Sequence, residues 1–230
     1  MQTKVELDEN DGSIFYRQQE CQNIYRGIEN IANSYGFSGI DPNTVMMGWA
    51  RNSSQPEEFA QMTDYLTQMD MNVLFLDYDE RYGFGEKKTL DIWWSHFDEY
   101  CDLSLYLSKF MMDSVEWSQL KVRILYNNGD NSTADYIEKI ISSKCETNRI
   151  EAEIVVVNNE LEQKSLYELV RKYSIETDLI FLELPFFQEH NEKVFIENTN
   201  SLLHDIGTTL IFRASTHFYE DSNLDPSLQK

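Results

Sequence analysis

Carboxylates gather in the segment LDYDERYG, residues 76–83, directly after an apolar run. Such a run predicts a buried strand, and α/β sheets bind ligands beside the carboxyl ends of their strands. The side-chain oxygens of Asp77 and Asp79 would suit a hard divalent cation at that place. A solvated loop of like charges fits the same residues, so the sequence leaves both interpretations open.

A second segment, NNGDNST at 127–133, has residue types that suit an anion-binding loop. It follows one predicted strand and precedes a predicted helix, where backbone amides at the helix N-terminus would meet an anion. The residues of this candidate nucleotide or anion loop are Asn127, Asn128, Gly129, Asn131 and Ser132. The loop has no Lys or Arg, and Asp130 opposes an anion. An ordinary turn and helix cap fit the same residues.

The remaining reactive groups show no catalytic or metal-binding spacing. They are His96, His190, His204, His217, Cys21, Cys101 and Cys145. The cysteines are odd in number and far apart, which is typical of buried thiols in a reducing compartment. GFGEKK at 83–88 lacks the third glycine of a dinucleotide fingerprint and precedes a strand, so it indicates a flexible connection between two halves of the chain. The histidines and cysteines therefore predict no enzyme, no metal site and no cofactor, and for Asp77 and Asp79 the solvated loop is the preferred interpretation.

Charge and hydropathy exclude two classes of partner. The net charge of the 230 residues is −21, which repels phosphate backbones and anionic headgroups. The most apolar run, LIFLELPFF at 179–187, is far shorter than the roughly 20 residues that span a bilayer. We therefore expect neither nucleic-acid binding nor membrane insertion by this chain.

The elements that would position these groups show two kinds of apolar pattern in turn, one typical of strands and one typical of helices. Apolar, β-rich runs predict strands at 44–50, 71–77, 89–94, 121–127, 151–157, 177–184 and 208–214, with a weaker one at 4–8. Helical patterns lie between most of them, at 13–36, 56–69, 102–112, 132–144, 162–174 and 191–205. Ser13 would cap the first helix and Gly36 would end it. This alternation predicts an α/β fold: a mainly parallel, doubly wound sheet with helices on both faces.

Two adjacent tryptophans, Trp93 and Trp94, end the run TLDIWW. Neighbours on a strand point to opposite faces, so a half-buried strand would leave one indole in water. A central strand covered on both sides removes the conflict, and we expect each indole to lie under a different helix layer.

The order of elements also repeats along the chain. A strand–helix–strand–helix–strand series over 4–77 matches one over 151–214, and the second has two additional strands in front, at 89–94 and 121–127. We interpret this as two similar α/β halves, although chance similarity between βαβ units fits as well. The predicted division is a first subdomain at 1–80, a linker at 81–88, a second subdomain at 89–220 and a tail at 221–230.

Several segments resemble the cytosolic C-terminal domain of the cation-chloride cotransporters, in a short, prokaryote-like form. The family has an aspartate and paired tryptophans on one strand, then a Leu-rich helix, another tryptophan and a K-[IV]-R strand. The matching residues here are Asp91, Trp93, Trp94, Trp117, Lys121 and Arg123. DPNTVMMGW at 41–49 resembles the family's P-N-T strand through Asn43, Gly48 and Trp49, and Pro185 matches a strand that ends in Leu-Pro. The matches fall in order over most of the chain.

This resemblance implies two subdomains of the universal-stress-protein type, the first incomplete at its N-terminus. It also implies a homodimer beneath a transmembrane domain that lies upstream in the same transporter, on the inner face of the cell membrane. The long regulatory insert of animal members is reduced here to ERYGFGEKK. Kinase control of the animal type is therefore not expected.

Two function classes follow. The first is a non-catalytic regulatory and dimerisation domain of a secondary cation-chloride transporter, which biases the conformations of the carrier through differential contacts. The alternative is a nucleotide-sensing domain of the universal-stress-protein type, with its site in loops after the strands at 44–50, 121–127 and 177–184.

Overall fold

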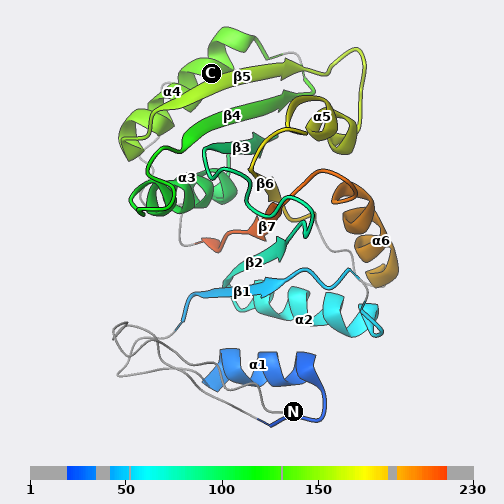
Figure 1. Cartoon of the computed structure of the whole chain (residues 1–230). Helices are drawn as coiled ribbons and strands as arrows, with labels where there is room; N and C mark the ends of the chain where they lie inside the picture. Colours follow the sequence, from blue (N-terminus) through cyan, green and yellow to red (C-terminus); the bar gives the residue numbers. More distant parts are fainter. Residues whose placement is uncertain (1–19, 35–41, 52, 131, 186–190, 217–230) are drawn as a thin grey trace.

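A computed structural model describes residues 20–34, 42–51, 53–130, 132–185 and 191–216, and these residues form seven strands and six helices that alternate except where β3 follows β2 directly (Figure 1). The strands are β1 (Thr44–Gly48), β2 (Asn72–Asp77), β3 (Thr89–Trp94), β4 (Lys121–Asn128), β5 (Ala152–Asn158), β6 (Leu179–Glu183) and β7 (Thr209–Arg213). The helices are α1 (Ile24–Ser34), α2 (Pro56–Gln68), α3 (Glu99–Met112), α4 (Ala134–Asn148), α5 (Leu166–Tyr173) and α6 (Glu192–Leu202). The predicted strand at 4–8 lies outside the described residues.

All seven strands form one sheet in the order β1-β2-β7-β6-β3-β4-β5. Every neighbouring pair is parallel except β2 and β7, which are antiparallel. The prediction of a mainly parallel α/β sheet is therefore confirmed, but the sheet is mixed. A prediction based on runs and periods could not find the antiparallel junction, because it joins strands more than a hundred residues apart.

Helices cover the sheet on both faces. One core cluster gathers apolar side chains of α2, α5 and α6, and a second gathers those of α3 and α4. Trp93 belongs to the first cluster and Trp94 to the second, with 2% and 0% of their surface exposed. Their indole nitrogens donate to the hydroxyls of Ser174 and Ser104, at 3.0 and 3.1 Å. The prediction that each indole lies under a different helix layer is confirmed.

Two β-α-β units meet at the antiparallel junction. Unit A is β1-α2-β2 and unit B is β6-α6-β7; Phe75 pairs with Ile211 at the centre of the junction. Trp49 N donates to Leu76 O, and Leu184 N donates to Phe212 O, both at 2.8 Å. The two strands of unit A therefore pair in the same register as the two strands of unit B. An approximate twofold axis through the Phe75–Ile211 pair relates the two units. The two units share one sheet and one core cluster, so the predicted subdomain boundaries at 81–88 stay a prediction.

The first helix is shorter than its predicted range of 13–36. It begins at Ile24, because the Asn23 side chain accepts hydrogen bonds from the backbone amides of Tyr25 and Arg26 and so caps the helix. Cys21 lies before the helix and is exposed, whereas Cys101 and Cys145 are buried as expected. The predicted cap Ser13 and stop Gly36 lie outside the described residues. Among the helices that the structure describes, none is long and apolar enough to cross a bilayer.

Candidate functional site

Asp91 ties three elements together at the amino end of β3. Its carboxylate accepts hydrogen bonds from Arg123 Nε and Nη2 at 2.9 and 2.6 Å, and from Thr177 Oγ1 at 2.8 Å. The same guanidinium donates to the carbonyl of Tyr173 at 2.8 Å. Asp91 is 1% exposed. A buried carboxylate is costly unless it is paired, and these hydrogen bonds provide the pairing. The role of this residue is structural.

Trp49 connects unit A to α6. Its indole nitrogen donates to Asn200 Oδ1 at 2.8 Å, and its ring packs edge-on against Phe59, Phe75 and Phe195. Arg51, two residues later, donates to Asp77 Oδ2 at 2.5 Å and to the carbonyl of Leu203 at 3.0 Å. These contacts fix the end of β1 to the second half of the chain.

The other residues of the predicted signature lie at the ends of strands. Asn43 precedes β1, and its carbonyl accepts the amide of Asn72 at 2.8 Å. Gly48 ends β1 and is exposed, and Pro185 follows β6. The structure spreads these residues over both halves, so they do not converge on one site.

The predicted anion loop is folded upon itself. Asn128 is buried, and its amide nitrogen donates to the carbonyl of Ser132 at 2.8 Å. Asp130 Oδ1 accepts the amide of Ser132 at 2.7 Å. A Cβ on Gly129 would meet open space. Asn127 Oδ1 is buried without a hydrogen-bond partner among the described residues, and Asn131 lies outside them. The polar groups that the structure describes mostly complete a turn.

Glu183 lies at the carboxyl end of β6, beside β3, where the order of strands reverses. Sheets of this type bind ligands at such a reversal. Burial raises the pKa of Glu183 to about 7, and the negative charges of Asp98 and Glu99 add to the rise, against the lowering effect of Arg213. The phenol oxygen of Tyr100 is buried nearby without a hydrogen-bond partner among the described residues.

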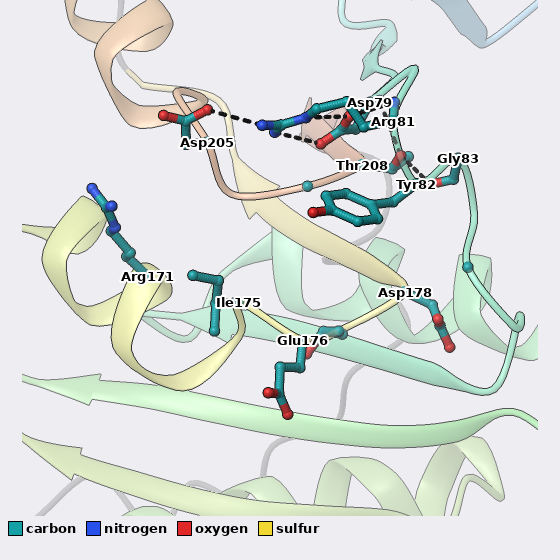
Figure 2. Close-up of a pocket in the computed structure, with 13 residues that line it drawn as sticks. Asp79, Arg81, Tyr82, Gly83, Arg171, Ile175, Glu176, Asp178, Asp205 and Thr208 are labelled. Atoms are coloured by element: carbon teal, nitrogen blue, oxygen red, sulfur yellow. Dashed lines mark hydrogen bonds and ion pairs between the residues drawn. The ribbon is translucent and has the colours of Figure 1, made fainter.

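A cavity of about 560 Å³ opens at the opposite end of the sheet, between the carboxyl end of β2 and the amino ends of β6 and β7 (Figure 2). Its lining comes from three segments far apart in the sequence: Asp79, Arg81, Tyr82, Gly83, Gly85, Arg171, Ile175, Glu176, Thr177, Asp178, Asp205, Gly207 and Thr208. The sequence indicated only the first of these segments, through its carboxylates.

Arginines neutralise the carboxylates that suggested a cation site. Asp79 accepts a bidentate contact from Arg81 Nε and Nη2 at 3.0 and 2.8 Å, which lowers the pKa of Asp79. Arg81 Nη1 also lies 3.5 Å from Asp205. Burial raises the pKa of Asp77, although its contact with Arg51 opposes the rise. Among the described residues no group of three His, Cys, Asp or Glu could hold a metal ion.

The cavity is suited to binding. Tyr82 is 74% exposed and lies between Arg81 and Ile175 in Figure 2. Arg171 donates to the hydroxyl of Tyr167 at 2.8 Å. The hydroxyl groups of the lining are those of Tyr82, Thr177 and Thr208. The ring of Tyr82, two guanidinium groups and several carboxylates offer stacking and polar contacts to a ligand.

Asp178 anchors the segment 81–88 that the sequence predicted to be a flexible connection. Its carboxylate accepts the backbone amides of Glu86, Lys88 and Thr89, each at 2.9 Å. Gly85 has a positive φ of +50°, and a Cβ there would lie 1.9 Å from Asp178 Oδ1. The closeness of this carboxylate explains the glycine, but no local pattern could have identified a partner about ninety residues away.

Comparisons with known proteins support the fold. No protein-family model matches the chain, and no curated protein matches it. The cytoplasmic domain of a prokaryotic cation chloride cotransporter superimposes with a TM-score of 0.62 and 14% identity, over 86% of this chain and 73% of that one. A universal stress protein from Archaeoglobus fulgidus DSM 4304 superimposes with a TM-score of 0.54 and 11% identity, over 84% and 66%. The chain therefore has the α/β fold of these two structures.

Proposed function

We propose that this chain is a non-catalytic regulatory and dimerisation domain of a secondary cation-chloride transporter, acting on the inner face of the cell membrane. The observation that carries the proposal is the fold shared with the cytoplasmic domain of a prokaryotic cation chloride cotransporter over 86% of this chain. The ordered matches of Asp91, Trp93, Trp94 and Trp49 to that family's pattern support it from the sequence side.

The contacts between units A and B are extensive enough for the two units to move together as one rigid body. Besides the β2–β7 junction, α2 packs on α6, and Trp49 and Arg51 both contact α6 or the residues after it. A packed body of this kind moves as a whole, so it biases the conformations of a carrier if it contacts them unequally. The proposal includes two subdomains of the universal-stress-protein type, with unit A in the first and unit B in the second.

The location of the chain in the cell tests this proposal. In the source organism, an antibody against residues 53–130 should detect the chain in the membrane fraction, retained after a carbonate wash and released by detergent. A cytosolic enzyme and an integral membrane protein serve as markers in the same gradient. Recovery of the chain with the cytosolic marker would contradict the transporter assignment.

A nucleotide-sensing role is the second candidate. It is favoured by the fold shared with a universal stress protein and by the buried, unpartnered Oδ1 of Asn127 in the loop after β4. A thermal-shift titration with ATP, ADP and cyclic dinucleotides tests it. A saturable rise in Tm that Asn127→Ala reduces would favour sensing, whereas a flat response with all three would exclude this candidate.

A further inference from the structure

The cavity of about 560 Å³ beside Tyr82 is lined by described residues. Its walls are the segment after β2, the connection from α5 to β6 and the turn from α6 to β7. The stretches 35–41, 186–190 and 217–230, which the structure does not describe, lie next to the start of β1 and the ends of β6 and β7. These three points are at the opposite end of the sheet. A cavity of this volume suits a small molecule.

Half of the charged side chains in the lining already have their partners. The guanidinium of Arg81 holds both carboxylate oxygens of Asp79, at 3.0 and 2.8 Å. The carboxylate of Asp178 accepts three backbone amides, each at 2.9 Å. Groups that are satisfied in this way gain little from a further hydrogen bond, so a ligand would be held by the others.

Arg171 and Asp205 keep unused hydrogen-bonding capacity, and their charges are opposite. Nη1 of Arg171 donates to the neutral hydroxyl of Tyr167 at 2.8 Å, and no described carboxylate pairs with this guanidinium. Its other nitrogens are available for the paired hydrogen bonds by which arginine holds a carboxylate. The side chain of Asp205 is 46% exposed; Oδ2 contacts His204, and Oδ1 has only the 3.5 Å contact with Arg81. A ligand with one carboxylate and one ammonium group matches this pair.

Two large apolar side chains line the same cavity and are left in water. Tyr82 is 74% exposed and Ile175 is 57% exposed. Figure 2 shows Tyr82 pointing toward Ile175 and Arg171, with Asp205 on the same side of the cavity as Arg171. Because removal of apolar surface from water is favourable, an apolar group of a ligand that packs on both side chains contributes to its binding.

We propose that this cavity binds a free α-amino acid with a large apolar side chain. The carboxylate of the ligand binds Arg171, and its ammonium group binds Asp205. Its side chain packs between Tyr82 and Ile175. The bound ligand connects the segment that leaves unit A with the α6–β7 turn of unit B, so it stabilises the placement of one unit against the other. The ligand is thus an effector of the regulatory domain, a role that rests on the proposed function, whereas the site itself rests on the cavity.

Ligands that lack one of the two charges test the need for both. The purified chain should bind L-phenylalanine or L-leucine saturably in isothermal titration calorimetry, with a rise in Tm. Phenylpropionate lacks the ammonium group and phenylethylamine lacks the carboxylate, so each should bind at least about 10-fold more weakly than L-phenylalanine. The absence of saturable binding for both amino acids would overturn the proposal. Equal binding of either analogue would overturn the assignment to an amino acid.

Substitutions in the lining test the position of the site. Arg171→Gln and Asp205→Asn should each weaken binding of the amino acid about 10- to 100-fold and change the Tm of the unliganded chain little, because both side chains are exposed. Lys172→Gln is the matched control, since it removes a neighbouring charge of α5 that does not line the cavity. Binding that Arg171→Gln and Asp205→Asn both leave unchanged would overturn this cavity as the site. The titration needs no membrane, so its failure and a failure of the membrane-fraction experiment are separate results.

Discussion

Units A and B have the same connectivity and the same register, but they differ in what covers them. In unit B the neighbours β3 and α3 bury Phe181, whereas the matching Met46 of unit A is exposed. Position 183 of unit B is a half-buried Glu, and its match in unit A, Gly48, has no side chain to titrate. The comparison shows that the burial of a strand residue here depends on elements contributed from elsewhere in the chain.

The largest expected effect comes from truncating the two matching side chains. Phe181→Ala should lower the free energy of unfolding by about 3–5 kcal/mol, because it opens a cavity in a fully packed site. Met46→Ala, measured in dilute protein, should change it by less than about 0.5 kcal/mol. Urea denaturation of both variants measures the difference. Equal losses would show that unit A is covered as well as unit B.

The contacts of Asp91, which join β3 to β4 and to the segment before β6, should come next. Asp91→Ala removes the acceptor of three hydrogen bonds and leaves the Arg123 guanidinium without its counter-ion. Since breaking a buried pair costs about 3–5 kcal/mol and Arg123 is partly exposed, we expect about 3 kcal/mol. Lys88→Ala, which removes an exposed pair with Glu86, is the control and should change the free energy of unfolding much less, because solvent screens that pair. A loss of less than about 1 kcal/mol for Asp91→Ala would show that these hydrogen bonds are not needed to hold β3 in place.

The variation of stability with pH should come in part from Glu183 in unit B. The pKa of Glu183 is about 7 in the folded chain, above its usual 4.5, so the folded state holds this proton more tightly. Stability from this group is therefore full below about pH 4.5 and is lost as the pH rises through 7. The loss should not exceed about 3.4 kcal/mol, the limit set by a rise of about 2.5 in the pKa. Glu183→Gln should flatten this part of the curve, and an unchanged slope would assign it to other groups.

The smallest effect should come from the connection between unit A and α6. Trp49→Phe keeps an aromatic ring among Phe59, Phe75 and Phe195 and removes the hydrogen bond to Asn200. We expect a loss of about 1 kcal/mol by chemical denaturation. Trp117→Phe is a comparison outside both units. A loss of several kcal/mol for Trp49→Phe would show that this one bond holds unit A in place.

The residues of the candidate sites could be predicted only in part. Asp79 was found because a run of carboxylates directly after a strand is visible in the sequence, but its partner Arg81 changes what it can bind. Asp178 was missed, since nothing beside it in the sequence distinguishes it from any other residue before a strand. Its importance comes from three amides at 86, 88 and 89, which the fold brings to it.

The sequence by itself determined the strands and helices and the double burial of Trp93 and Trp94, because the period of apolar residues is a local property of the chain. Only the tertiary structure decided the antiparallel junction of β2 with β7, the cavity beside Tyr82 and the exposure of Met46. These features depend on contacts between residues far apart along the chain, and no pattern within one segment specifies which distant segment will lie against it.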